Sequence, residues 1–206
     1  MAINSGRLGL LLLSGVAIAA VLLARRQQAG ETQDSAGWFL PDIFGFMKTG
    51  MDVSKLQDSE FRASITAGRG NQYFNELESI GGRYGLPPYM LPRVAYQESR
   101  FRDDIITGKT KSSAGAAGMF QLMPVHWSAV NPLDWRAAGD YAARYLLGHF
   151  KRFGNWPAAL AAYNWGQGNV AKHLNTYGAL RLEKLPSETR NYVNEIMRDL
   201  GGDMNW

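Results

Sequence analysis

Helical periodicity governs most of this chain. From Asn71 onward, apolar residues recur every three or four positions, and no stretch of useful length alternates apolar and polar residues as a β-strand does. The clearest stripes are Tyr73, Phe74, Leu77, Ile80 and Tyr84, then Ala138, Tyr141, Ala142, Tyr145 and Leu146, then Tyr192, Val193, Ile196 and Leu200. The pattern predicts a mainly α fold, with one helical domain over residues 70–206.

Capping residues mark where several helices begin and end. Asn155 is a predicted N-cap for a helix through Ala162, since its side chain can accept from the free N–H groups of the first turn. Gly166 and Gly168 are expected to stop that helix. Ser187 is the predicted cap of the last helix.

The N-terminal segment reads as a membrane anchor. Leu8 to Ala24 carries no charge and lies at the short end of the length that spans a bilayer, about 17–25 residues. Arg25 and Arg26 follow at once, where a signal peptide would show small residues. Residues 1–26 are therefore expected to be an N-terminal transmembrane helix; a cleaved signal and a buried core helix are the alternatives.

Residues 27–69 are expected to link this anchor to the helical domain. The linker starts with a polar stretch and continues with the aromatic segment 37–47, GWFLPDIFGFM. That segment either packs on the domain surface or lies at the membrane interface, a zone that Trp and Phe favour. Residues 48–69 read as further connector with room for a short helix.

Composition excludes several classes of function. The chain has no cysteine, and its three histidines, His126, His149 and His173, lack the spacing of metal ligands. We therefore expect no zinc site. The formal net charge of +4 is spread along the chain, whereas nucleic-acid binders usually carry a denser basic stripe, so no nucleic acid is expected as a partner. The mild excess suits an anionic polymer such as a cell wall, or simply a solvated surface.

Glu98 is the candidate catalytic residue. The helix predicted over residues 89–99 has an apolar face that includes Leu91, and the register of that face reaches Glu98 two turns later. Burial raises the pKa of a carboxyl group, and a raised pKa suits a general acid at neutral pH. The alternative is a half-buried residue at a helix end, paired with Arg100 or Arg102.

Two later segments favour the catalytic interpretation. Residues 112–124, SSAGAAGMFQLMP, combine small residues that permit close approach with the amide of Gln121, which suits a sugar. Residues 161–166, AAYNWG, place a phenol, an amide and an indole beside a helix end.

These motifs, taken in order, resemble the soluble-type lytic transglycosylases, a branch of the lysozyme-like fold. The resemblance spans roughly residues 72–200. It rests on Glu98-Ser99, Gly115-x-x-Gly118-x-x-Gln121, Ala162-Tyr163-Asn164-x-Gly166, Tyr84-Gly85-Leu86-Pro87 and Glu188-Thr189-Arg190-Asn191-Tyr192-Val193. One departure is that Met119-Phe120 stands where Leu-Met is usual in the family, which puts the shape of that subsite in doubt.

The resemblance implies a role for each residue of the site. Glu98 would be the single acid–base residue, and Ser99 would lie beside the saccharide next to the cleaved bond. The other expected roles are hydrogen bonding to sugar for Gln121, lining of the groove for Phe120 and Tyr163, and orientation of Glu98 or its polar surroundings for Asn164 and Tyr192. The implied substrate is the glycan strand of peptidoglycan, cut between N-acetylmuramic acid and N-acetylglucosamine with formation of a 1,6-anhydro ring. The reaction that the resemblance implies needs no metal and no organic cofactor.

Other functions stay open at this point. A lysozyme-type hydrolase of the same fold would need a second carboxylate, and the candidates from sequence are Asp103 and Asp104. A non-catalytic module that binds the wall would keep the groove without the chemistry. The expected location is the membrane, with the catalytic domain facing the periplasm and wall. A secretion, conjugation or phage-entry machine, or a phage virion, would provide a suitable setting.

Overall fold

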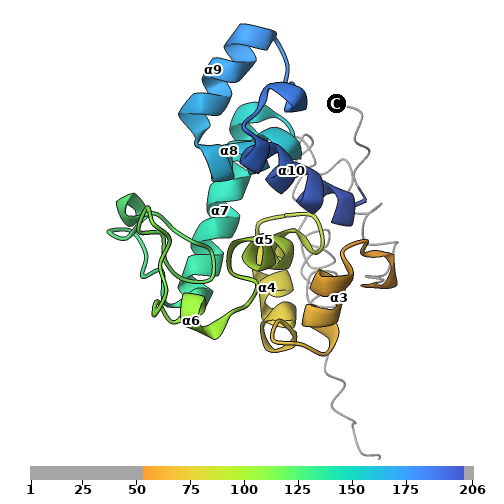
Figure 1. Ribbon diagram of the computed structural model, residues 1–206, viewed down its shortest axis with the longest axis vertical. Coiled ribbons are helices and arrows are strands. Elements are labelled where there is room, and N and C mark those ends of the chain that lie inside the picture. Colours follow the sequence, from red (N-terminus) through yellow and green to blue (C-terminus); the bar gives the residue numbers. More distant parts are fainter. Residues whose placement is uncertain (1–52, 202–206) are drawn as a thin grey trace, which may run out of the picture. The chain divides into compact units, whose positions relative to one another are not determined.

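The computed structural model describes residues 53–201, and within that range the chain is helical (Figure 1). The elements are η1 (Val53–Lys55), α3 (Ser59–Thr66), α4 (Asn71–Arg83), α5 (Met90–Ser99), α6 (Asp103–Ile106), η2 (Pro124–His126), α7 (Trp135–Phe153), α8 (Trp156–Trp165), α9 (Gln167–Tyr177), η3 (Leu182–Lys184) and α10 (Ser187–Asp199). No strand occurs among these residues, where β-pairing is limited to an isolated antiparallel bridge between Ala117 and Leu122. The predicted mainly α fold is confirmed.

Helix α5 lies in the middle of this body, with α4 and α10 packed against it (Figure 1). The long helix α7 contacts α4, α5 and α8, and α8 in turn contacts α10. Buried alanines on α7 and α8 allow close approach of the two helices because they add little side-chain bulk; they include Ala138, Ala142, Ala143, Ala158, Ala159 and Ala161. The two helices that carry Glu98 and Tyr192 are therefore fixed against one core.

The helix ends agree with the sequence in part. Asn155 does cap α8, and its Oδ1 accepts the backbone N–H of Ala158 at 2.9 Å. Gly166 does end α8, with a φ of 95°, as predicted, but the stop predicted at Gly168 is wrong, because α9 begins at Gln167 and Gly168 lies in its first turn. The predicted cap at Ser187 is wrong: Pro186 precedes the helix, and Ser187 is its first residue.

The predicted linker, residues 27–69, includes residues that belong to the folded body. Leu56, Phe61 and Ile65 are buried in the same core as α5, and Asp58 caps α3 through the N–H groups of Glu60 and Phe61. The physical reason is that Phe61 and Ile65, one turn apart, give α3 an apolar stripe that buries against the body. The folded region thus begins before residue 70.

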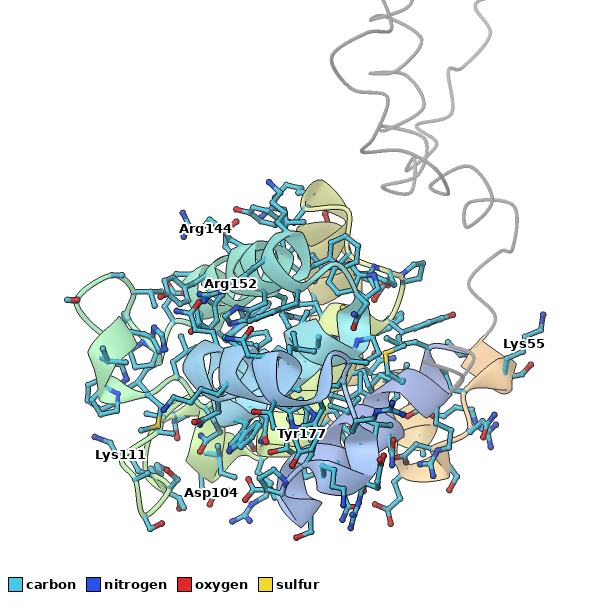
Figure 2. The ribbon with its side chains drawn as sticks, turned by 90° about the horizontal axis from the view of Figure 1, so that it is seen from above. Lys55, Asp104, Lys111, Arg144, Arg152 and Tyr177 are labelled. Atoms are coloured by element: carbon cyan, nitrogen blue, oxygen red, sulfur yellow. The ribbon has the colours of Figure 1, made fainter. Side chains whose placement is uncertain are left out.

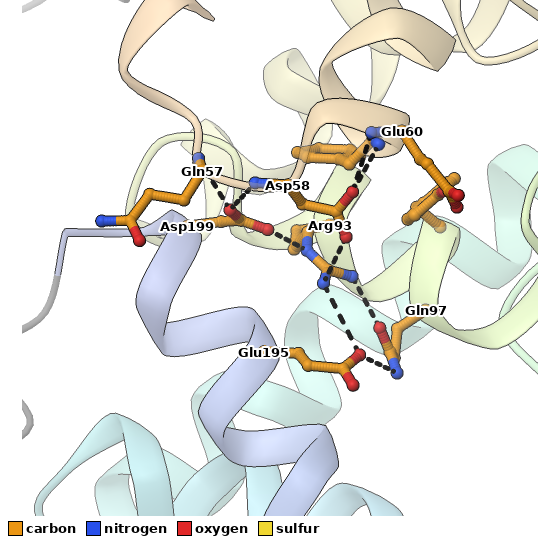
Figure 3. A network of polar contacts seen from close by, with 9 residues as sticks. Gln57, Asp58, Glu60, Arg93, Gln97, Glu195 and Asp199 are labelled. Atoms are coloured by element: carbon orange, nitrogen blue, oxygen red, sulfur yellow. Dashed lines mark hydrogen bonds and ion pairs between the residues drawn. The ribbon is translucent and has the colours of Figure 1, made fainter.

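A buried arginine ties this N-terminal part to α5 and α10 (Figure 3). The Arg93 side chain is fully buried, and its Nε donates to Asp199 Oδ2 at 2.6 Å. Its Nη1 donates to Gln97 and its Nη2 to Asp58, at 2.7 and 3.3 Å. Asp199 Oδ1 also accepts the backbone N–H groups of Gln57 and Asp58. A buried charge needs such partners, and here they come from three different parts of the chain.

No helix within residues 53–201 is long and apolar enough to cross a membrane. The predicted anchor, residues 1–26, and the aromatic segment 37–47 lie outside the described residues.

Candidate active site

Glu98 lies in the last turn of α5, where its register places it on the same face as the buried Leu91, but Glu98 itself is only half-buried. The Tyr192 hydroxyl of α10 donates a hydrogen bond to Glu98 Oε1 at 2.8 Å. The pKa of Glu98 is raised to about 7: burial is the largest cause, the hydrogen bond from Tyr192 works against it, and the negative charge of Glu188 adds to it. At neutral pH the group therefore exists in both protonation states, which is the condition for an acid that later acts as a base.

The end of α5 is held in an unusual conformation. Arg100 and Phe101 both have positive φ, at 50° and 51°, a region that non-glycine residues seldom occupy. The Ser99 hydroxyl donates to the Ala95 carbonyl at 2.8 Å and accepts the Phe101 N–H at 3.2 Å. Such strain persists where surrounding contacts fix it, and it is common beside functional groups.

This turn changes the expected role of Ser99. Its side chain is buried and its hydroxyl is engaged on both sides by the backbone, so it is not presented to a sugar. Ser99 instead stabilises the turn that follows Glu98.

The glycine-rich segment forms a tight turn that presents Gln121. Gly118 has a φ of 77°, and a side chain there would overlap the Pro132 carbonyl oxygen, so only glycine fits. Gln121 also has a positive φ, and its Nε2 donates to the Gly118 carbonyl at 3.0 Å. The Phe120 ring is fully buried and lies against Gly139, so the expectation that it lines the groove is wrong: a fully buried ring has no face to offer a sugar.

Tyr163 connects α8 to this turn. Its hydroxyl donates to the Phe120 carbonyl oxygen at 3.0 Å, and its ring contacts that of Tyr145 edge-on. Burial, followed by the nearby charge of Glu98, raises the pKa of Tyr163 well above its usual value. Tyr163 therefore stays a neutral phenol near Glu98 and acts as a hydrogen-bond donor.

Asn164 acts on the site through α10. Its Oδ1 accepts the hydroxyl of Thr189, which is buried in the first turn of α10, at 2.8 Å. Thr189 lies one turn before Tyr192, so this bond fixes the helix that carries the Glu98 partner. Its contact is thus with the surroundings of Glu98.

The second carboxylate that acts on Glu98 is Glu188, and not Asp103 or Asp104 as the sequence suggested. Glu188, exposed in the first turn of α10, is the carboxylate whose charge raises the pKa of Glu98. Asp104 instead pairs with Arg102 at 2.7 Å, and neither Asp104 nor Asp103 contributes to the Glu98 pKa. Glu188 and Thr189 belong to the motif of residues 188–193 that resembles the family. The motif alone does not indicate what either residue does.

A family of known proteins matches the part of the chain that carries most of this site. Residues 75–185, more than half of the chain, match the family described as Transglycosylase SLT domain. The chain belongs to this family. The SLT domain of this chain therefore shares the lysozyme-like fold, as the resemblance implied.

Two known proteins are similar to this chain. The SLT domain is similar to lysozyme g of Epinephelus coioides, with 27% identity over 154 residues, which cover 62% of this chain and 76% of that protein. It is also similar to the crystal structure of the 70 kDa soluble lytic transglycosylase of Escherichia coli, with 27% identity and a TM-score of 0.50. That alignment covers 68% of this chain and 26% of the larger enzyme, so the chain spans about a quarter of its length.

Proposed function

We propose that this protein is a peptidoglycan lytic transglycosylase that cuts the β-1,4 bond between N-acetylmuramic acid and N-acetylglucosamine. The observation that carries the proposal is Glu98 at the end of α5, half-buried, with a pKa of about 7 and bonded to the Tyr192 hydroxyl. Such a group can deliver a proton and, once ionised, take one back at neutral pH. Membership of the SLT domain family supports the same chemistry.

Glu98 would perform both proton transfers of the reaction. Protonated Glu98 donates to the bridging oxygen as the bond from that oxygen to the muramoyl C1 breaks. The substrate itself stabilises the positive charge at C1. Ionised Glu98 then removes the proton of the C6 hydroxyl as its oxygen bonds to C1, which closes the 1,6-anhydro ring. No water is consumed, so the reaction balances as a lyase reaction.

The neighbouring side chains would position the substrate and Glu98. The Tyr192 hydroxyl holds one carboxyl oxygen, which leaves the other oxygen of Glu98 to reach the glycosidic bond. Tyr163, which lies near this carboxyl, and the partly exposed Gln121 would hold the sugars, and neither needs to lose or gain a proton. Tyr163 would also keep the Phe120 turn in place through its hydrogen bond.

A lysozyme-type hydrolase is the second candidate, and one observation favours it. Glu188 lies close enough to raise the pKa of Glu98, so a second carboxylate is present that could hold a water. The similarity to lysozyme g agrees with this alternative. Hydrolysis would leave a reducing end in place of the anhydro ring.

We further propose that the protein works at the membrane, with its SLT domain facing the wall, since the apolar run before the domain is suited to an anchor. A secretion, conjugation or phage-entry machine would use such an enzyme to open the wall locally.

The experiment that tests the catalytic proposal is digestion of purified sacculi with wild type and three variants. Wild type should release 1,6-anhydromuramoyl products, whose mass is one water below that of hydrolytic products. Glu98→Gln should lose activity by at least roughly 10²–10⁴-fold, since it cannot transfer a proton. Glu188→Gln and Asp104→Asn should still give anhydro products. A fully active Glu98→Gln would refute the assignment, and reducing ends that vanish in Glu188→Gln would establish the hydrolase.

A further inference from the structure

Gln97 comes directly before Glu98 in α5, and both ends of its side-chain amide are bound (Figure 3). Its Oε1 accepts from Arg93 Nη1 at 2.7 Å, and its Nε2 donates to Glu195 Oε2 of α10 at 3.1 Å. A guanidinium can only donate and a carboxylate can only accept, so these two partners fix the direction of the amide. None of the roles assigned to the active site uses Gln97.

This amide belongs to a series of side-chain hydrogen bonds that cross from α5 to α10. In chain order along α5, the bonds join Arg93 to Asp199 at 2.6 Å, Gln97 to Glu195 at 3.1 Å, and Glu98 to Tyr192 at 2.8 Å. The residue numbers rise along α5 and fall along α10, so the two helices run in opposite directions along this seam. Glu195 lies one turn from Tyr192 on the same face of α10. The bond from Gln97 is therefore the neighbour of the bond that holds Glu98.

The bonds of this series differ in how firmly packing holds them. The side chains of Arg93 and Asp199 are fully buried, so the first bond has little freedom. The Glu195 side chain is 36% exposed and Glu98 is half-buried, so packing alone does not fix these two carboxylates. Gln97 connects the buried end of the series to the catalytic end, because Arg93 holds its amide oxygen. A second bond beside the one from Tyr192 also prevents α10 from rotating about that single contact.

We propose that Gln97 is a positioning residue of the reaction, whose amide fixes α10 against the end of α5 and so keeps the Tyr192 hydroxyl aligned on Glu98. The inference rests on the proposed function, because it takes Glu98 as the reactive group. The position requires an acceptor toward Arg93 and a donor toward Glu195, which glutamine supplies and glutamate does not. Both ends of the amide are occupied by protein groups, so Gln97 affects the rate and not the binding of substrate.

The test breaks this bond from either end in the full chain. Gln97→Met keeps the length of the side chain and removes both amide contacts, whereas Glu195→Met removes only the acceptor and leaves the contact with Arg93. Each variant should reduce kcat by roughly 3–10-fold through poorer orientation, with KM unchanged. Glu195→Gln keeps an oxygen that can accept from Gln97, so its kcat should stay close to that of wild type.

The pKa of Glu98 separates a loss of alignment from a general loss of stability. The hydrogen bond from Tyr192 lowers this pKa, so both methionine variants should raise it, in the same direction as Tyr192→Phe. In a chain that already carries Tyr192→Phe, Gln97→Met should cause no further shift. Carbon-13 NMR of the labelled glutamate carboxyls measures this pKa in the full chain without substrate, and Glu98→Gln identifies the signal.

Gln167→Met is the matched control. Gln167 of α9 accepts from Arg152 Nη1 of α7 at 2.6 Å, and Figure 2 shows Arg152 on α7, apart from α10. This variant also removes a glutamine that joins two helices, but it lies outside the seam between α5 and α10. It should leave both kcat and the pKa of Glu98 unchanged.

The outcomes distinguish this proposal from the proposed function. An unchanged Glu98 pKa in both methionine variants would overturn the role of Gln97, and so would a further shift when Gln97→Met is added to Tyr192→Phe. Equal losses of kcat in Glu195→Gln and Glu195→Met would show that the charge of Glu195 matters rather than the bond, which would also overturn it. If wild type cleaved no strand, the proposed function would fail, and the NMR titration would still test Gln97.

Discussion

Burial raises the pKa values of Glu78 and Glu98, but the two glutamates have different roles. Burial raises the pKa of Glu78 in α4 to about 7, as it does for Glu98. Glu78 accepts the backbone N–H of Tyr89 at 2.7 Å and so stabilises the left-handed turn, φ 65°, from which α5 begins. Glu98 instead has Tyr192, Tyr163 and Glu188 around it, and this setting, in addition to its pKa, marks it as the reactive group.

The pKa of Glu98 predicts a pH dependence of stability. The folded state keeps the Glu98 proton between pH 4.5 and about 7 while the unfolded state loses it, so the free energy of unfolding falls as pH rises through this window. Glu98→Gln should remove this loss, worth up to about 3 kcal/mol relative to wild type at pH 7 and above. Chemical denaturation at a series of pH values measures the difference.

Glu78→Gln is the control for this prediction. The pKa of the Glu78 carboxyl is raised to about 7 as well, so this variant should also lose less stability than wild type as pH rises. Its activity should stay unchanged. If Glu98→Gln and wild type showed parallel stability curves from pH 4.5 to 7, the raised pKa of Glu98 would be wrong.

Tyr192 should set the pH limit of the reaction. Its hydrogen bond lowers the pKa of Glu98, so Tyr192→Phe should move the alkaline limb of kcat/KM to higher pH and reduce kcat by roughly 10-fold through poorer orientation. Tyr84→Phe removes a hydroxyl–carboxylate bond of the same 2.8 Å length, to Asp140, outside the site, and should leave the pH profile unchanged. An unchanged profile in Tyr192→Phe would contradict the assigned role.

Some of these residues could be predicted from sequence and others could not. The register of α5 is sufficient to predict that Glu98 faces inward, because Leu91 on the same face is buried. The sequence could not show that Ser99 turns its hydroxyl to the backbone or that Phe120 enters the core. Both outcomes depend on positive φ angles in turns, which the residue types do not specify.

Helix α5 is held against both α3 and α10 by the Arg93 contacts of Figure 3. Arg93 joins Asp199 at the end of α10 to Asp58 at the start of α3, and it precedes Glu98 in α5 by about 1.4 helical turns. The burial of Arg93 was not predictable, because residues 53–69 read as a connector and α3 was therefore not expected to cover this face of α5. The sequence does not predict helix α9 either. Gly166 ends α8 and also precedes the first residue of α9, but a glycine after a helical stretch indicates only the end of a helix.

Removing one charge of this network should destabilise the whole body. Asp199→Asn leaves the buried Arg93 with Asp58 at 3.3 Å and Glu195 at 4.0 Å, so we expect a loss of about 3–5 kcal/mol in unfolding free energy. Asp140→Asn, which breaks a surface pair with Arg83, should cost less than about 1 kcal/mol. Similar losses in the two variants would mean that the buried pair contributes no more than a surface one.

The expected N-terminal anchor predicts that the protein is located at the membrane. The full chain should stay with membranes after a carbonate wash, and deletion of residues 1–26 should give a soluble chain that still cuts sacculi, because every residue of the site lies in the described body. A mature N-terminus just after Ala24 would instead indicate a cleaved signal. Loss of activity on deletion would mean that the segment does more than tether the enzyme.

Digestion of sacculi in water enriched in oxygen-18 shows whether one glutamate cleaves the strand without consuming water. In a lytic reaction the new end takes its oxygen from the muramoyl C6 hydroxyl, so the products should carry no heavy oxygen, and Glu98→Gln should release none of them. One heavy oxygen at each new muramoyl end would show that water attacks the sugar, which would contradict the lytic mechanism.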